Sequence, residues 1–243
     1  MTGFDVMGGV ELTMYAAIMI AVVSIVMGRD TAQRLKCAVA LTGWFVIVVI
    51  LAATGALHDQ PGIRSAGLGL AVVVPIGLMW LALMRVPSLR HGLDHAPLAI
   101  LVGVHAVRIL GVSFLILEAS HRLPAPFAPA AGWGDIIAGI AAIPVAWMVH
   151  RQTRGWRTAL AVWNLYGLAD LVSAVSLGML SSPGPLRRIF TEPGTGLMSP
   201  LPWLLIPGFL VPLLATTHLM IFHRLVKSAP AHAFIGKKQP AGF

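Results

Sequence analysis

Two charged residues inside long apolar stretches are the features of this sequence that could do chemistry. Arg108 lies in the run VHAVRILG and Asp170 in the run WNLYGLAD. A charge at the centre of a bilayer costs roughly 2.5–3.5 kcal/mol on insertion scales, so such residues are candidates for function. Because their depths match, we expect Arg108 and Asp170 to form an ion pair. That pair either fixes helix packing or lines a site or pathway.

Further polar side chains lie in the same apolar stretches and in the last one, nearer the expected inner face. His105 precedes Arg108 by three residues and Tyr166 precedes Asp170 by four, so each pair shares a helix face. We expect a polar lining formed by His105, Asn164, Tyr166 and His218.

Haem is the cofactor that these histidines could bind, since a b-type haem takes axial ligands from facing helices. The candidate pairs are His105 with His218 and His58 with His121. The alternative is that His105 and His218 are hydrogen-bonded interior residues. The estimated depths of these two residues differ, which favours the alternative.

Three acidic residues lie near the outer ends of the predicted helices: Glu11, Glu118 and Asp135. Facing a water-filled entrance, they could capture a proton or a cation as an outer acidic mouth. The alternative is that each is simply solvated at the interface. Asp135 follows two glycines and could instead cap the N-terminus of its helix.

The connection RLPAPFAPAAGWGD, residues 122–135, combines prolines and glycines with apolar side chains. Prolines and glycines disfavour a regular helix, so we expect a helix to begin only after Gly132 and Gly134. The apolar composition predicts a loop that dips back into the membrane, either as a lid or as a passive plug. In the last apolar stretch, Pro207 and Pro212 predict a kink.

Long helices are needed to position these residues, and the sequence predicts seven. A helix needs about 20 apolar residues to cross the ~30 Å hydrocarbon core. The predicted spans lie near residues 8–28, 37–57, 66–84, 97–120, 132–150, 158–180 and 201–223. We therefore predict an all-α polytopic membrane protein, with a bundle of seven transmembrane helices in residues 1–227. Residues 228–243 are predicted to form a flexible cytoplasmic tail.

The composition excludes a soluble protein and orients the chain in the membrane. Of the 243 residues, 57% are hydrophobic and 11% charged, against about 25% charged in a typical soluble domain. The net charge of +8 comes mostly from Lys and Arg in the tail and in the loops after the first, third and fifth spans. Basic loops stay inside, so the N-terminus is predicted outside and the C-terminus inside. These residues would meet anionic lipid head groups of the bilayer, and we expect no nucleic acid partner.

Several activities lack their sequence signatures. A retinal protein needs a lysine in the last helix, but Lys36 and Lys227 lie at helix ends and the other two lysines lie in the tail. Nucleotide-binding glycine motifs, H-E-x-x-H and G-x-S-x-G are not found. The single cysteine, Cys37, cannot form an internal disulfide. We therefore predict neither catalytic nor metal-binding residues, and enzyme activity is disfavoured.

The stretch from His105 to Gly139, with HAVRILG, LPAPFAPAAGWGD and IIAG, resembles a group of uncharacterised bacterial multi-pass inner-membrane proteins. The resemblance covers about a sixth of the chain. It implies a bacterial inner (cytoplasmic) membrane location and supplies no reaction.

Three functions remain open on this sequence. The first is a transporter or permease for a small solute or a proton. The second is a non-catalytic assembly or sensor subunit with a membrane protein partner, in which the buried polar groups only hold helices together. The third is a haem-binding membrane redox subunit.

Overall fold

The computed structural model describes residues 2–57 and 64–227; helices make up 81% of the structure, and these ranges contain no strand. Seven segments within them are long and apolar enough to cross a membrane. The prediction of an all-α bundle with seven spans is therefore confirmed, whereas the tail at 228–243 lies outside the described residues. The spans are α1 (Gly3–Met27), α2 (Thr31–Ala53), α3 (Arg64–Arg85), a composite fourth span (Leu98–Ala119), α7 (Phe127–Arg151), α8 (Trp156–Ser181) and a composite seventh span (Ile206–Lys227).

Both composite spans depart from regular α-helix in their central or first part. The fourth consists of α5 (Leu98–Gly103), the 3-10 helix η1 (Val104–Gly111) and α6 (Val112–Ala119). The seventh begins as the π-helix η3 (Ile206–Leu210) and continues as α9 (Val211–Lys227). Irregular turns of both kinds often mark functional positions in helices. Two short helices lie outside the spans: α4 (Pro87–His95) and η2 (Thr195–Met198).

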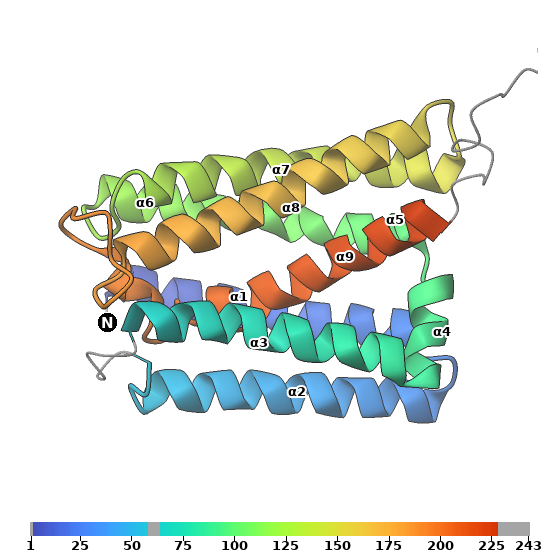
Figure 1. The fold of residues 1–243 in the computed structure, drawn as a ribbon, viewed down its shortest axis with the longest axis horizontal. Helices are drawn as coiled ribbons and strands as arrows, with labels where there is room; N and C mark the ends of the chain where they lie inside the picture. Colours follow the sequence, from blue (N-terminus) through green and yellow to red (C-terminus); the bar gives the residue numbers. More distant parts are fainter. Residues whose placement is uncertain (1, 58–63, 228–243) are drawn as a thin grey trace, which may run out of the picture.

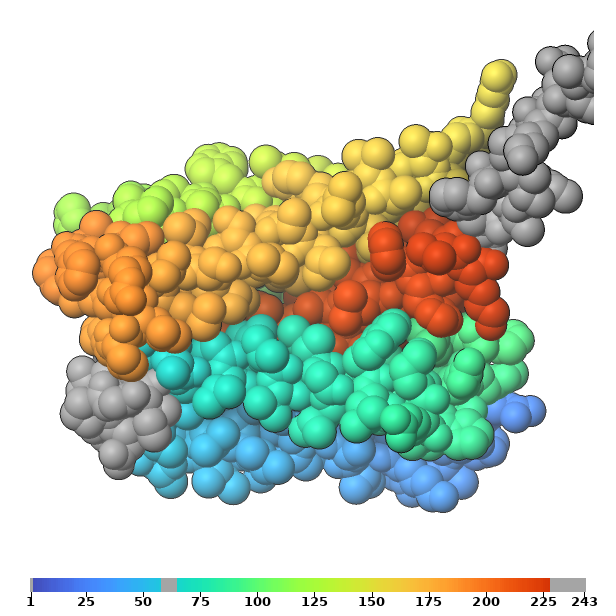
Figure 2. Space-filling view, in the orientation of Figure 1, coloured from blue at the N-terminus to red at the C-terminus, as the bar shows by residue number. Residues whose placement is uncertain are grey.

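The spanning helices run side by side along the long axis of the molecule (Figure 1). We call its two ends the Thr2 end, where α1 begins, and the Lys227 end, where α9 finishes. Helices α5 to α8 form one side of the bundle, α2 forms the opposite edge, and α4 lies across the Lys227 end. Figure 2 shows the face on which α8, α3 and α2 lie next to one another.

Glycines bring the fourth span into backbone contact with α7. A Cβ added to Gly111 would lie 2.7 Å from the Gly132 carbonyl oxygen, and one added to Gly139 would lie 2.7 Å from the Ile109 nitrogen. Small residues allow helices in membranes to approach this closely. The contact holds Arg108, which lies between Gly111 and the start of η1, directly against α7.

Helix α7 begins earlier than the prolines and glycines of its sequence predicted. It starts at Phe127 and runs unbroken through Gly132 and Gly134, so the expected late helix start is wrong. Pro129 lies in the first turn, where a helix has no internal partner for its N–H groups and proline removes no hydrogen bond. Asp135 consequently lies about 12 Å along the helix and cannot be its N-cap.

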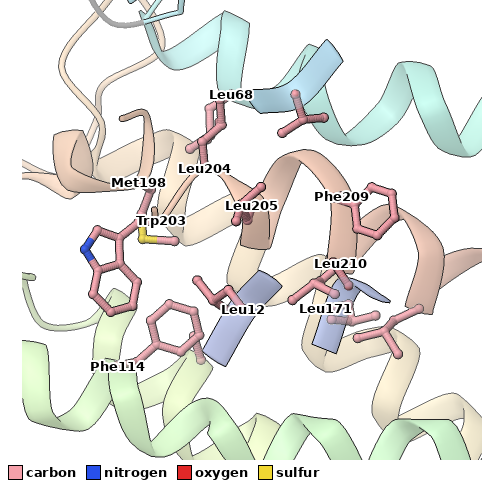
Figure 3. Close-up of a cluster of buried hydrophobic side chains, with 14 of the residues drawn as sticks. Leu12, Leu68, Phe114, Leu171, Met198, Trp203, Leu204, Leu205, Phe209 and Leu210 are labelled. Atoms are coloured by element: carbon pink, nitrogen blue, oxygen red, sulfur yellow. The ribbon is translucent and has the colours of Figure 1, made fainter. Parts of the chain in front are cut away.

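Two clusters of buried apolar side chains fill the bundle, one toward each end. The Thr2-side cluster, drawn in Figure 3, includes Phe114, Leu171 and Trp203. The Lys227-side cluster includes Leu101 and Leu160. On the outside, large apolar side chains stay exposed along the spans, which suits contact with lipid acyl chains. The chain is an integral, multi-pass membrane protein.

A polar contact at the Lys227 end joins α4 to α9. The Lys227 Nζ donates to the Asp94 Oδ1 at 2.8 Å, and the His223 Nε2 lies 3.8 Å from the same oxygen. Arg224 also donates to the carbonyl oxygen of Ala96, just after α4. The end of the last span is thereby tied to the helix that crosses the end of the bundle.

Acid should weaken this tie between α4 and α9. The Lys227 ammonium, which donates to Asp94, holds the pKa of that carboxyl below its usual range. A lowered folded-state pKa stabilises the protein above the unfolded value and loses this effect as pH falls. Asp94→Asn should therefore lower the thermal unfolding midpoint at pH 7, by the equivalent of about 0.2–1 kcal/mol for an exposed pair.

The effect of Asp94→Asn should shrink as the pH is lowered to about 3, below the ordinary pKa of an aspartate. Thermal unfolding of the two proteins in the same detergent across this range measures it. A difference that stays constant with pH would show that the Asp94 charge contributes nothing. Glu192→Gln, which removes another exposed carboxylate, serves as a comparison for general charge effects.

Candidate functional site

A layer of polar side chains separates the two apolar clusters on four spans. On α8, Leu160 belongs to the Lys227-side cluster and Leu171 to the Thr2-side cluster, with Asn164 and Asp170 between them. The fourth span, α7 and α9 show the same order along their lengths. This polar layer consists of His105, Arg108, Asp135, Asn164, Asp170, Thr217 and His218.

Arg108 is the centre of the polar layer, and only 1% of its side chain is exposed. Its Nε donates to the Asp135 Oδ1 at 2.7 Å, and its Nη2 donates to the Asp170 Oδ2. Its Nη1 donates to the Gly167 carbonyl oxygen at 3.1 Å. One guanidinium is thus shared by two carboxylates, one on α7 and one on α8.

The structure brings the predicted partners Arg108 and Asp170 together and adds Asp135, which the sequence placed at the outer mouth. The two carboxylates are 17% and 11% exposed, so all three charges lie in largely apolar surroundings. With both acids ionised, the centre carries one more negative than positive charge. Binding a single proton makes it neutral, and buried charge is favoured only when it is balanced.

His218 extends this centre toward the Lys227 end. Its Nε2 faces the Arg108 Nη1 at 3.3 Å, and because arginine can only donate, this nitrogen is the acceptor. The His218 Nδ1 therefore carries the hydrogen and donates to the Asn164 Oδ1 at 2.8 Å. Asn164 in turn donates from Nδ2 to the His218 carbonyl oxygen at 3.2 Å, which fixes both side chains.

His105 is the last member of the polar layer in this direction. The Thr217 hydroxyl donates to the Leu214 carbonyl oxygen at 2.7 Å, so it accepts a hydrogen from the His105 Nε2 at 2.8 Å. The His105 Nδ1 is then a buried acceptor, and it has no hydrogen-bond partner in the described part of the chain. Trp163 covers the two histidine rings, with centroids 5.1 Å from each.

A haem does not fit between His105 and His218. Their ring centroids are only 4.1 Å apart, so no porphyrin plane can lie between them. Each Nε2 is also engaged already, with Thr217 and with Arg108. Of the second predicted pair, His58 lies outside the described residues.

A small cavity borders Arg108 and Asp135 on the Thr2 side. Its volume is about 50 Å³, and its polar lining comes from Glu11, Arg108, Ser113 and Asp135. A cavity needs about 10–15 Å³ of such volume for one water molecule, together with two to four polar partners. The space therefore admits a few water molecules. Trp203 and Gly8 line it on the side of the Thr2 end.

The remaining predicted residues are not gathered into one site. Glu11 lines the cavity, but Glu118 is half-buried near the end of α6, and Asp135 belongs to the charged centre. The predicted outer acidic mouth of these three residues is therefore not formed as a group. Tyr166 is 39% exposed on α8, and none of the hydrogen bonds described for the polar layer involves it.

One polar cluster near the Thr2 end was missed in the sequence. The Asp5 Oδ1 accepts from the Arg122 Nη2 at 2.7 Å and from the Trp203 Nε1 at 3.0 Å. Thr2 donates to the other carboxylate oxygen, and its own hydroxyl accepts from the Asp5 nitrogen in a capping box. The T-x-x-D spacing is a recognisable sign of that cap. Nothing in the spacing indicates the distant partners Arg122 and Trp203.

Comparison with known families gives one match. A family model described as Domain of unknown function (DUF8737) matches residues 65–226. The matched range runs from α3 into α9, so it contains the whole polar layer and leaves out α1 and α2. No curated protein and no solved structure matches the chain.

Proposed function

We propose that this chain, which belongs to the DUF8737 family, is a proton-linked transporter or permease for small solutes. The proton-binding centre in this proposal is formed by Arg108, Asp135 and Asp170. The observation that carries it is the sharing of one buried guanidinium by two carboxylates from different helices. Such a centre changes charge when it takes up a single proton.

The position of the centre supports a role in transport rather than in packing alone. Asp135 and Asp170 belong to helices α7 and α8, and His218 to α9, so protonation alters forces between several spans at once. Ionisable residues at membrane depth commonly form proton relays in pumps and transporters. A proton that neutralises one carboxylate weakens its hold on Arg108 and permits those helices to shift.

The polar layer and the cavity together extend along part of the bundle. From the Thr2 side the order is Glu11, the cavity, the charged centre and then His218 with His105. The Lys227-side cluster closes this series beyond His105. In this proposal the structure corresponds to an occluded state of the transporter, with the centre separated from both ends of the bundle.

We place the protein in the inner membrane of a bacterium, with the Lys227 end in the cytoplasm. Exposed basic side chains cluster at that end: Arg29, Arg34, Lys36, Arg85, Arg90, Arg151 and Arg154. Cytoplasmic loops of membrane proteins carry such an excess of Lys and Arg. The resemblance of residues 105–139 to bacterial inner-membrane proteins supports the same location.

Proton flux into liposomes tests this function. The purified full-length chain is reconstituted with a pH-sensitive dye inside the vesicles, and an inside-negative potential is applied with potassium and valinomycin. We expect the internal pH to fall faster than in empty vesicles. Asp135→Asn and Asp170→Asn should each abolish the difference, because an amide cannot exchange a proton at this centre.

Glu192→Gln is the matched control, since it removes a carboxylate that is 79% exposed and lies in the connection after α8, which ends at Ser181. Its flux should equal that of the unmodified protein. Flux that persists in both Asp variants would exclude the proposed centre. A folded, correctly inserted protein that carries neither protons nor any solute tested would favour the assembly-subunit alternative.

A further inference from the structure

We infer that Trp203, held in place by Asp5, is the gate through which water and protons reach the charged centre from the Thr2 end. This inference rests on the proposed function, because it assigns the route by which that centre is supplied. It is supported by the position of the Trp203 ring, by its single polar anchor and by the closure of the opposite route.

The Trp203 ring lies between the Thr2 end and the cavity. Its Nε1 contacts Asp5 in the first turn of α1, whereas the cavity continues deeper along the same helix, past Glu11 and Leu12. The ring is 1% exposed and stacks with Phe4 at a centroid distance of 5.7 Å. Figure 3 shows Trp203 grouped with Met198, Phe114 and Leu12.

The Trp203 ring packs directly against Gly8. A Cβ added to Gly8 would lie 2.9 Å from the Trp203 Cη2. Any other residue at this position would therefore displace the ring. Both residues also line the cavity. Displacing the ring from Gly8 therefore opens the cavity toward the Thr2 end.

The backbone that carries Trp203 is suited to such a displacement. Residues 201–204 form turns, and the π-helix η3 follows from Ile206 to Leu210. This segment departs from the regular α-helical hydrogen-bond ladder, and irregular turns of this kind often occur at functional sites. The ring is anchored instead by one hydrogen bond to Asp5, whose carboxylate is in turn held by Arg122.

In the opposite direction, packed apolar side chains lie beyond the polar layer. Beyond His105, the Lys227-side cluster contains Leu93, Leu160 and Ile221, each fully buried. Two cavities border Asp135, and neither is lined by these residues. The route to the charged centre therefore opens at the Thr2 end, when the Trp203 ring moves.

The test measures how fast a cysteine inside the cavity reacts with a charged, membrane-impermeant methanethiosulfonate. Cys37→Ala removes the single native cysteine, and Leu12→Cys places a thiol on the cavity wall. Leu101→Cys is the matched control, since Leu101 is similarly buried but belongs to the Lys227-side cluster. Phe190→Cys, at a side chain that is 77% exposed, identifies the vesicles in which the Thr2 end faces the reagent.

We expect Leu12→Cys to react slowly in the otherwise native protein. Adding Asp5→Asn or Trp203→Phe should raise its rate by about tenfold or more, as loss of a charge-assisted hydrogen bond allows. The increase should occur in the vesicles in which Phe190→Cys reacts. Trp133→Phe, which alters an exposed tryptophan outside the gate, should leave the rate unchanged.

The gate would be excluded if neither substitution accelerated the reaction at Leu12→Cys, or if acceleration occurred only from the Lys227 end. An equal increase at Leu101→Cys would indicate general loosening of the bundle and would also exclude it. The labelling rate requires no proton flux. A protein that labels as expected but carries no protons therefore refutes the proposed function and not the access route.

Discussion

Arg108→Leu should be the most damaging single substitution in the polar layer. It leaves the carboxylates of Asp135 and Asp170 in apolar surroundings without their shared cation. These groups must then stay charged without a partner or take up protons, and both states are unfavourable compared with the native centre. Removing one partner of a buried charge pair typically destabilises a protein by about 3–5 kcal/mol. We expect a corresponding loss of folded protein and a lower thermal unfolding midpoint in detergent.

The neutral triple variant separates lost charge balance from lost packing. Arg108→Leu combined with Asp135→Asn and Asp170→Asn removes every charge of the centre, so it should unfold at a higher temperature than Arg108→Leu alone. Proton flux should be absent from both. If the triple variant proves no more stable than the single one, the damage comes from the lost volume and hydrogen bonds of the arginine, and the charge argument fails.

Gly134→Ala should disrupt the same centre without changing any charge. A Cβ at this position would overlap the Asp170 carboxylate. This carboxylate cannot move aside freely, because it accepts a hydrogen bond from Arg108. Inserting a methyl group into a packed interior costs about 1–3 kcal/mol. The carboxylate must also move away from the guanidinium, so proton flux should fall together with the unfolding midpoint.

Gly77→Ala makes the identical chemical change in α3, where a Cβ meets no atom within 4 Å. Alanine is favoured over glycine inside a helix by about 1 kcal/mol, so this variant should be as stable as the unmodified protein or more so. Equal behaviour of the two variants would contradict the close approach at Gly134. Flux measured in the same liposomes distinguishes a displaced carboxylate from a merely weakened helix.

Helix spans and depths could be read from the sequence, because both depend on local composition. Arg108 and Asp170 each interrupt a long apolar run at a similar distance from its inner end, and they are in contact in the structure. The apolar runs themselves predicted seven spans. Their boundaries differed by up to six residues: the second span begins at Thr31 rather than near 37, and the last begins at Ile206 rather than near 201.

Local composition could not predict contacts that depend on the rotation of a helix about its axis or on residues distant in the sequence. Asp135 was assigned to the outer end because prolines and glycines precede it. However, Pro129 is harmless in a first turn, Gly132 packs against the fourth span and Gly134 packs against Asp170 of α8. Trp203 and Asp5 are separated by almost the whole chain, and no local pattern links them. A haem between His105 and His218 is excluded by the spacing of their rings, which composition does not reveal.

The 3-10 geometry of η1 determines how its inward residues are arranged along the membrane normal. His105, Arg108 and Gly111 are the buried residues of this segment, one in every three. With three residues per turn they form a straight column with steps of about 6 Å, whereas in an α-helix each would be rotated by about 60° from the last. An α-helical backbone would thus rotate His105 and Gly111 by about 60° to opposite sides of Arg108. The alignment of His105, Arg108 and Gly111 is consequently a property of the 3-10 backbone. A substitution that makes this segment α-helical would remove the alignment without altering any polar group.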